Sequence, residues 1–441
     1  RVGTWLPRPT PVAMAERRRR PPATVPAAAL ALPAVPPAVG GDGNPPRCLL
    51  EAPEPESKKG NNFSKGVRWS PDGTTLLTAH DDSTLRLFAV NPEVLASSSS
   101  AAEAPPDGVA AGPGLLEPYA KAVEGGPVLD FAFFPSFSWQ NPATCCFIAS
   151  SQDHPIHLRE AVGGTLCNSY RPFNQVEEVC HAYSICFSPD GGKILGGFSQ
   201  YIRVFDVQRP GRQVEDWLLT TKKGKGQKGI IGALAGASES PGLYAAGSYN
   251  RSVCVYHQGS RGKPVAWLVD REQDYEMGGV TQLAWANEWL LLSGHRRDPW
   301  LRAWDLRMAS SDDGSASEGR GLRPKALLHR FPRSARTHQR FLFGVQGCRL
   351  SVGTDEGDAV IYSLSTLEEE SRIVGAHTRP CVSAMLHPTC NALVTSAGGR
   401  CFPNYDVESS AGSDSDSPAV GKKRPRGGDP AAGGVGTLDN S

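Results

Sequence analysis

The sequence predicts an all-β protein folded as a seven-bladed β-propeller with disordered N- and C-terminal extensions. Three observations lead to this prediction. A pattern of short apolar strands separated by tight turns returns seven times between Asn61 and Asp406, at steps of roughly 40 to 60 residues. Glycine and proline are abundant, with 48 and 37 residues, which favours many turns. The two ends have a composition that cannot bury enough apolar surface to offset the entropy of ordering.

The repeat is clearest in two stretches, GVRWSPDGTTLLTAHDDSTLRLFAV from Gly66 and YSICFSPDGGKILGGFSQYIRVFDV from Tyr183. In both, Pro-Asp-Gly follows the first strand and predicts a tight turn, because proline presets φ and glycine accepts a positive φ. Looser copies start near Val128, Ile230, Val280, Arg340 and Cys381. The third strands are expected to end at Phe88, Leu158, Phe205, Tyr256, Trp304, Tyr362 and Phe402.

The ends of the third strands identify the type of propeller. Trp304-Asp305 is the dipeptide typical of WD repeats, and Phe205-Asp206 is a variant of it. A ring of such blades protects the sheet edges that an open sheet would expose. We expect the apolar residues 48–50 to supply an outer strand that latches the last blade. An arginine recurs in the third strands, as Arg86, Arg203 and Arg302, and a structural role is expected for it.

Composition divides the chain into three parts. Residues 1–45 form a Pro/Ala/Arg-rich extension, residues 46–407 form the propeller with a low-complexity loop at 96–114, and residues 408–441 form a tail. The tail joins an acidic Ser-Asp block to a basic cluster, which we interpret as a nuclear-import signal, the alternative being a solvated charge run. The cluster consists of Lys422, Lys423, Arg424 and Arg426.

Overall composition excludes several classes of protein. Lysine and arginine (46) almost balance aspartate and glutamate (45), so bulk charge predicts no partner. No apolar run approaches the roughly 20 residues that span a bilayer, and neither a collagen-like chain nor a long coiled coil fits. The eleven cysteines include no C-x-x-C pair and are expected to be reduced thiols used as small core residues.

The sequence contains no recognisable catalytic motif, so we expect no enzyme activity and no cofactor. It lacks H-E-x-x-H, a P-loop and the G-x-S-x-G elbow. His154 and His157 stand three residues apart at the start of a predicted strand and therefore point to opposite faces. The sequence thus predicts no metal site.

Cations gather in the loops that should share one end of the propeller. These are the loops before the first strand and between the second and third strands of each blade. Such sorting in a chain of net charge +1 favours a polyanion site with salt-dependent binding, although Gly/Lys-rich loops can also serve solubility alone. Phe63, Tyr201 and Tyr249 are candidates to stack unpaired bases. The cations are Lys222, Lys223, Lys225, Lys228, Arg251, Arg296, Arg297, Arg330, Arg333, Arg336, Arg340 and Arg400.

Several stretches together resemble the telomerase Cajal body protein 1 family of WD-repeat proteins, which bind CAB-box RNAs. They include NNFSKGVRWSPDG, ASSQDHPIHLREAVGG, IRVFDVQRPGR, KKGKGQKGII and LYAAGSYNRSVCVY, and they run in order over the region from Gly60 to Asp406. The resemblance implies a non-enzymatic nuclear scaffold that recognises the CAB box of small Cajal body RNAs and telomerase RNA. It would direct these ribonucleoproteins and telomerase to Cajal bodies and support telomere maintenance.

The resemblance also implies partners and contacts. The partners are H/ACA proteins such as dyskerin, telomerase reverse transcriptase, coilin, the survival-of-motor-neuron complex and, for folding, the TRiC chaperonin. The insert at 96–114 and the loop REQDYEMGG before the fifth blade depart from the family's pattern. An alternative is a generic WD-repeat scaffold that binds acidic or phosphorylated protein segments through the same cations. The expected RNA contacts are Phe63, Lys222, Lys223, Lys225, Lys228, Arg212, Tyr249, Arg251, Arg296 and Arg297.

Overall fold

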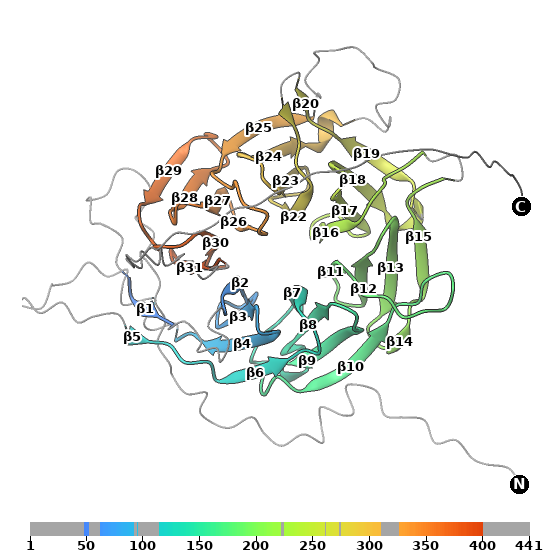
Figure 1. Ribbon diagram of the computed structural model, residues 1–441, viewed down its shortest axis with the longest axis horizontal. Helices are drawn as coiled ribbons and strands as arrows, with labels where there is room; N and C mark the ends of the chain where they lie inside the picture. The colour runs from blue at the N-terminus through green and yellow to red at the C-terminus, as the bar shows by residue number, and fades with distance from the viewer. Residues whose placement is uncertain are drawn as a thin grey trace, which may run out of the picture. The chain divides into compact units, whose positions relative to one another are not determined.

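Short antiparallel sheets follow one another around a ring, each beginning with a strand that faces the centre (Figure 1). The computed structural model describes residues 48–52, 62–91, 95, 114–221, 225–260, 262–272, 275–309 and 326–399. The expected N-terminal extension and C-terminal tail lie outside these residues, as does the basic cluster at 422–426. The same holds for the insert, apart from Gly114, and for the third strand expected near Phe402.

Each sheet pairs its strands in chain order, which is the arrangement of a propeller blade. The first three four-stranded sheets are called blades 1 to 3. Blade 1 contains β2 (Ser64–Trp69), β3 (Thr75–His80), β4 (Thr84–Ala89) and β6 (Ala120–Val123); blade 2 contains β7 (Val128–Phe133), β8 (Cys146–Ser151), β9 (Ile156–Glu160) and β10 (Leu166–Arg171); blade 3 contains β11 (Ser184–Phe187), β12 (Lys193–Gly197), β13 (Tyr201–Asp206) and β15 (Glu215–Leu218).

The next three sheets, blades 4 to 6, have the same order. Blade 4 contains β16 (Ile231–Gly236), β17 (Leu243–Ser248), β18 (Ser252–His257) and β19 (Pro264–Leu268); blade 5 contains β22 (Val280–Trp285), β23 (Leu290–His295), β24 (Trp300–Asp305) and β25 (Leu327–Pro332); blade 6 contains β26 (Leu342–Gln346), β27 (Arg349–Gly353), β28 (Ala359–Ser363) and β29 (Glu369–Ile373).

The smaller elements complete the described chain. A closing hairpin of two strands follows blade 6, and β14 adds to the outer edge of blade 2, parallel to β10. None of the described helices is long and apolar enough to span a membrane. The elements are β30 (Cys381–Leu386) and β31 (Leu393–Ala397) of the closing hairpin, β14 (Gly211–Arg212), the pairs β1 (Leu50–Glu51) with β5 (Gly114–Leu115) and β20 (Arg271–Glu272) with β21 (Tyr275–Glu276), and the 3-10 helices η1 (Pro142–Thr144), η2 (Gln258–Ser260) and η3 (Leu306–Met308).

The number of blades differs from the prediction. The described residues form six four-stranded blades rather than seven, and two strands stand where the seventh blade was expected. β30 of the closing hairpin pairs in parallel with β26 of blade 6 and contacts β2 of blade 1, so the hairpin closes the ring between them. The prediction of seven is wrong for the described part because its last repeat provides only this hairpin.

The predicted third strands are confirmed in all six blades. β4, β9, β13, β18, β24 and β28 each contain the expected final residue at or near their end. Buried clusters lie between neighbouring blades: Phe205 of blade 3 belongs to one cluster with Ile148 of blade 2, and Tyr362 of blade 6 to one with Leu292 of blade 5. The aromatic ends of these strands therefore join one blade to the next rather than filling a core inside one blade. The ten described cysteines are free thiols.

The prediction that residues 48–50 latch the last blade is confirmed for their packing but not for their strand pairing. β1 does not add to the closing hairpin; it pairs in parallel with β5, where Leu50 is opposite Gly114. The Leu50 side chain is 3% exposed and belongs to one buried cluster with Met385 and Val394 of the closing hairpin. The apolar segment at 48–50 thus covers the junction between hairpin and blade 1 without joining the hairpin's sheet.

Polar side chains join the inner strands of neighbouring blades. In β7, β22 and β30 the register shifts just before such a side chain, as expected for a bulge that redirects it. Each then bonds the backbone of the next blade. Asp130 Oδ2 accepts from Ile185 N (3.0 Å), Ser184 Oγ donates to Ile231 O (2.9 Å), Gln282 Nε2 donates to Phe343 O (2.8 Å) and Ser383 Oγ donates to Val67 O (3.1 Å).

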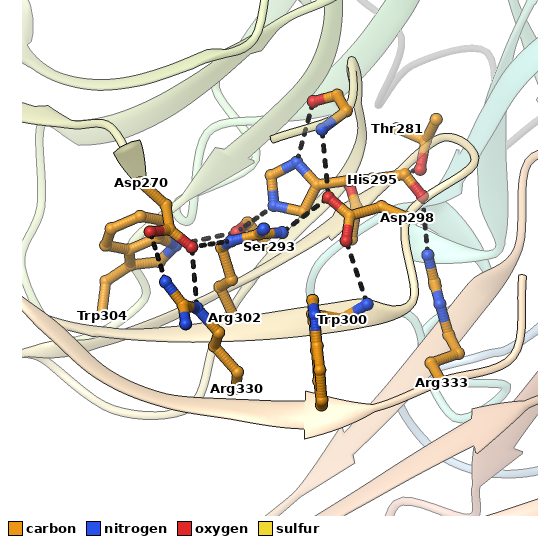
Figure 2. Close-up of polar contacts among 12 residues, drawn as sticks. Asp270, Thr281, Ser293, His295, Asp298, Trp300, Arg302, Trp304, Arg330 and Arg333 are labelled. Atoms are coloured by element: carbon orange, nitrogen blue, oxygen red, sulfur yellow. Dashed lines mark hydrogen bonds and ion pairs between the residues drawn. The ribbon is translucent and has the colours of Figure 1, made fainter. Parts of the chain in front are cut away.

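Blade 5 contains a buried network that the sequence presented only as scattered residues (Figure 2). Trp304 Nε1 donates to Ser293 Oγ (2.7 Å), which lies 2.8 Å from His295 Nε2. His295 Nδ1 lies 3.2 Å from the carbonyl oxygen of Gly278. His295 is 1% exposed, and burial followed by the charge of Arg302 lowers the pKa of His295 to about 3. The imidazole is therefore neutral near pH 7.

Blade 1 repeats this arrangement with different neighbours. Thr78 Oγ1 lies 2.8 Å from His80 Nε2, and Arg86 forms two hydrogen bonds with Asp82, the shorter at 2.6 Å. Burial lowers the pKa of His80 to about 3, and the charge of Arg86 adds to the effect. The structural role expected for the recurring arginines is confirmed, since Arg86 and Arg302 are 7% and 0% exposed and paired with aspartates.

Acid should destabilise the ring through these two histidines. The unfolded chain takes up a proton on each near pH 6.5, whereas the folded chain resists until about pH 3, so stability falls as pH falls through this window. Each histidine contributes a slope of up to about 1.4 kcal/mol per pH unit. Urea unfolding between pH 7 and pH 5 measures it. His295→Gln should lose part of the slope; an unchanged slope would contradict the assignment.

Candidate polyanion-binding end

Strand register places the cationic loops at one end of the ring. Ser248, the last residue of β17, pairs both with Ile231 at the start of β16 and with Ser252 at the start of β18. His295 at the end of β23 likewise pairs with Val280 at the start of β22. The turns after β17 and β23 and the loops before β16 and β22 therefore share one end. We call it the basic end and define it by Lys225, Lys228, Arg251, Arg296 and Arg297.

The lysine-rich loop before blade 4 is anchored by a residue that the sequence did not single out. Gln227 is fully buried, and its Nε2 donates to Ala246 O (2.9 Å) and Ser252 O (3.1 Å). Its Oε1 accepts from the Tyr256 hydroxyl (2.9 Å). The two glycines of the stretch KGQKG have positive φ values of +118° and +85°, which lets the chain turn inward at Gln227 and outward on either side.

The lysines beside Gln227 point outward as a result. Lys225 and Lys228 are exposed, and the structure shows no acidic partner for either within the described residues. The loop closes on itself where Thr221 N donates to Lys225 O (2.7 Å). Lys222 and Lys223 lie outside the described residues. The loop thus presents unpaired cations from a rigid base.

An aromatic ring and a guanidinium stack next to this loop. The Arg296 guanidinium carbon lies 4.7 Å from the centroid of the Tyr249 ring, and both residues are partly buried. The ring lies against Gly232, where a Cβ atom would come within 2.1 Å of it. Arg296 Nε has no hydrogen-bond partner among the described residues. A cation stacked on an aromatic ring beside exposed lysines is suited to a base or a phosphate.

The turn that holds Arg296 and Arg297 rests on the blade 5 network (Figure 2). Asp298 accepts from Arg302 Nη1 (2.7 Å) and from the backbone nitrogens of Gly278 and Trp300, both at 3.0 Å. Arg302 and Arg330 both bond Asp270, and pairing with them holds the pKa of Asp270 below its usual range despite burial. The turn is therefore preorganised before any ligand binds.

Arginines occupy a strained position in two of these turns. The turn between the second and third strands has a residue with positive φ in every blade: Ser83, Asp153, Gln200, Arg251, Arg297 and Gly357. Blade 6 has glycine, the residue that adopts this conformation without strain. Arg251 and Arg297, at +61° and +51°, are bulkier than the position favours. Both are exposed, so packing in a core does not account for the two arginines at these positions.

Other residues of the predicted set lie apart from this group. Arg212 lies on β14 at the outer edge of blade 2, bonded twice to Glu177 (2.6 and 2.7 Å) and stacked on Phe173. Phe63, before β2, is partly buried, and its carbonyl accepts from the backbone nitrogen of Asp81. Tyr201 packs on Arg203 at 5.1 Å. The structure does not bring these three residues into contact with the stack of Tyr249 and Arg296.

Several expected surface arginines are already engaged. Arg330 pairs with Asp270, Arg336 lies near Asp355 and Glu356, and Arg340 bonds Asp130. Arg333 is 2% exposed and donates through Nη2 to His295 O (2.7 Å), and burial lowers its pKa to about 10. The expectation that all twelve cations form one open surface is wrong, because folding pairs Arg330, Arg336 and Arg340 with carboxylates and buries Arg333. Arg400 lies outside the described residues.

Sequence reasoning also missed His338. Arg297 Nη1 lies 3.4 Å from His338 Nε2, so the segment before blade 6 extends the basic end. A histidine two residues after Arg336 gave no separate signal. Within the described parts of the chain, no group of three His, Cys, Asp or Glu side chains is placed to hold a metal ion.

Comparison with known proteins agrees with the repeat pattern. The family "WD domain, G-beta repeat" matches residues 59–89, which include the first three strands of blade 1, β2, β3 and β4. Telomerase Cajal body protein 1 of Mus musculus is 33% identical over 81% of this chain and 63% of its own length. The proteins of the same name from Mesocricetus auratus and Homo sapiens are 33% and 31% identical over 78% and 81% of this chain.

The chain is a WD-repeat relative of telomerase Cajal body protein 1. The resemblance expected from the sequence is thereby confirmed. The chain covers 59% and 61% of the hamster and human proteins, so it spans about three fifths of the relatives it matches. Their names associate those proteins with telomerase and Cajal bodies.

Replacing a strained arginine separates binding from stability. Arg297→Gly removes the left-handed strain and should leave the free energy of unfolding unchanged or raise it by up to about 1 kcal/mol. The same change should lower the salt concentration at which the protein elutes from a heparin column, because an exposed cation is lost. Gly357→Ala is the opposite change at the equivalent position of blade 6: it introduces strain and a Cβ atom within 2.0 Å of the carbonyl oxygen of His377, so it should lower stability. A destabilised Arg297→Gly protein with unchanged elution would contradict the assignment.

Proposed function

We propose that this chain is a non-enzymatic RNA-binding scaffold that recognises the CAB box of small Cajal body RNAs and telomerase RNA. It thereby directs these ribonucleoproteins and telomerase to Cajal bodies and supports telomere maintenance. One observation carries the proposal. Lys225, Lys228 and Arg297 are exposed cations around a partly buried stack of Tyr249 and Arg296, on one end of a chain related to telomerase Cajal body protein 1.

The chemistry of this end suits a single-stranded RNA loop. Exposed lysines and arginines contact phosphates without reading sequence, and they make binding dependent on salt. A tyrosine that is held in place can stack an unpaired base, which a hairpin loop offers and a duplex does not. Gln227 and the blade 5 network hold these groups in position, which reduces the entropy lost on binding.

The rest of the proposal follows the same relatives. The partners would be H/ACA proteins such as dyskerin, telomerase reverse transcriptase, coilin and the survival-of-motor-neuron complex, with TRiC assisting folding. The protein would act in the nucleus, in Cajal bodies and at telomeres, and the basic cluster at 422–426 would serve import. A scaffold that binds acidic or phosphorylated protein segments would use the same cations, but it would not read bases.

Binding of the full chain to a CAB-box hairpin tests the proposal. The comparison is a hairpin of equal length with a scrambled loop, at about 150 mM salt. The intact loop should bind at least tenfold more tightly. Neutralising Lys225, Lys228, Arg296 and Arg297 to glutamine should weaken both complexes and reduce the slope of log affinity against log salt by up to about 3, since each contact with single-stranded RNA contributes roughly 0.7.

Two variants serve as controls for charge. Arg212→Gln removes a cation at the outer edge of blade 2, and Arg307→Gln removes one that follows β24, at the other end of blade 5. Both cations are paired with carboxylates, so neither change should alter the preference for the intact loop. Equal binding to the two hairpins would refute sequence-specific RNA recognition and would favour the protein-binding scaffold.

A further inference from the structure

A side chain from blade 6 crosses the centre of the ring. Arg340 lies just before β26, yet its Nη1 bonds Leu129 O (3.2 Å) and Asp130 Oδ1 (2.9 Å) in β7 of blade 2. Around the ring, the closing hairpin and blade 1 stand between these two blades (Figure 1). Arg340 therefore spans the middle, and because it precedes a first strand it enters from the basic end.

A second arginine meets the same carboxylate. Arg68 of β2 places Nη2 3.4 Å from Asp130 Oδ1, and its guanidinium carbon lies 5.5 Å from the centroid of the Phe131 ring. Asp130 is 3% exposed and already accepts from the backbone nitrogens of Phe131 and Ile185, both at 3.0 Å. Oδ1 of Asp130 thus takes three donors and Oδ2 takes one, so a single carboxylate is shared by two backbone nitrogens and two arginines.

The centre of the ring consequently holds unbalanced positive charge. Two guanidinium groups face one carboxylate, and the Nε atoms of both Arg68 and Arg340 lack partners within the described residues. The thiol of Cys186 adds no negative charge, since burial raises its pKa to about 12. Both Nε atoms are buried, but the Arg68 and Arg340 side chains as a whole are 29% and 22% exposed. Excess positive charge at a partly exposed site favours an anion.

We propose that Arg68 and Arg340 form a phosphate-binding site at the centre of the ring. Each guanidinium offers a planar fork of N–H donors that matches the oxygens of a phosphate group. Asp130 holds both arginines in place and keeps the site from carrying two uncompensated charges when it is empty. The phosphate group comes from one of two sources, an RNA bound at the basic end or a free phosphorylated small molecule.

Thermal unfolding of the full chain with pyrophosphate, in the absence of RNA, tests the site by itself. Against sodium chloride of equal ionic strength, 10 mM pyrophosphate should raise the Tm by at least about 2 °C, because it binds the folded chain only. Arg68→Gln and Arg340→Gln should lose most of this rise. The double variant Lys225→Gln/Lys228→Gln should keep it, which separates the central site from the basic end.

Arg340→Lys is a control for the case that the glutamine variants fail to fold. It keeps the cation and loses the fork, so its rise in Tm should lie between those of the natural chain and Arg340→Gln. No rise in the natural chain, or a rise that Lys225→Gln/Lys228→Gln abolishes, would overturn the proposal. This arm contains no RNA, so its result does not depend on whether the chain recognises a CAB box.

A second arm identifies the source of the phosphate. If the pyrophosphate effect is present and Arg340→Lys also weakens hairpin binding tenfold or more, an RNA phosphate fills the site. If the effect is present and hairpin binding is unchanged, the ligand is a free phosphorylated small molecule. Either result supports a phosphate site at the centre of the ring.

Discussion

Neighbouring blades of this ring are joined by buried polar side chains rather than by backbone ladders between their inner strands, apart from the pairing of β30 with β26. Asp130, Ser184, Gln282 and Ser383 each reach from one inner strand to the backbone of the next. A hydrogen bond of this kind contributes only about 1 kcal/mol when it forms, but an unpaired buried polar group costs more. The blades therefore have a preferred relative position, and this position also determines where the loops at their ends lie.

The same constraint positions the basic end. Separating Asp298 from Arg302 would leave a buried charge without its partner, which is costly. The ion pair therefore holds the turn that carries Arg296 and Arg297 in place. Gln227 does the same for the lysine loop through neutral hydrogen bonds. Strain in the turns is tolerated on this rigid base, which is why arginine can occupy a position that suits glycine. The buried residues that stabilise blades 4 and 5 therefore also hold the loops of the basic end in position.

The sequence predicted the repeats well because each one carries its own local signals. Pro-Asp-Gly turns in two blades and strands ending in an aromatic residue in five blades, with Leu158 in blade 2, placed the third strands of all six blades. The closing of the ring was harder to predict, since it depends on contacts between residues more than 300 positions apart, such as Ser383 with Val67. Local patterns contain no information about such pairs.

The arrangement of the candidate site was predicted in part. Loop position correctly gathered Lys225, Lys228, Tyr249, Arg296 and Arg297, because blade topology determines which loops share an end. Counting cations could not show which of them meet a carboxylate after folding. Arg212, Arg330 and Arg340 all pair with acids that are distant in the sequence. Gln227 gave no signal because a buried glutamine between lysines resembles any polar loop residue.

Ultraviolet crosslinking of the full chain to a CAB-box hairpin, followed by mass spectrometry of the crosslinked peptides, tests whether RNA binds at the basic end. We expect crosslinks to Tyr249 and to peptides that contain Lys225, Lys228 or Arg296. Crosslinks confined to the outer edge of blade 2 around Phe173 and Arg212, or to the opposite end of blade 5 around Arg307, would show that RNA binds elsewhere.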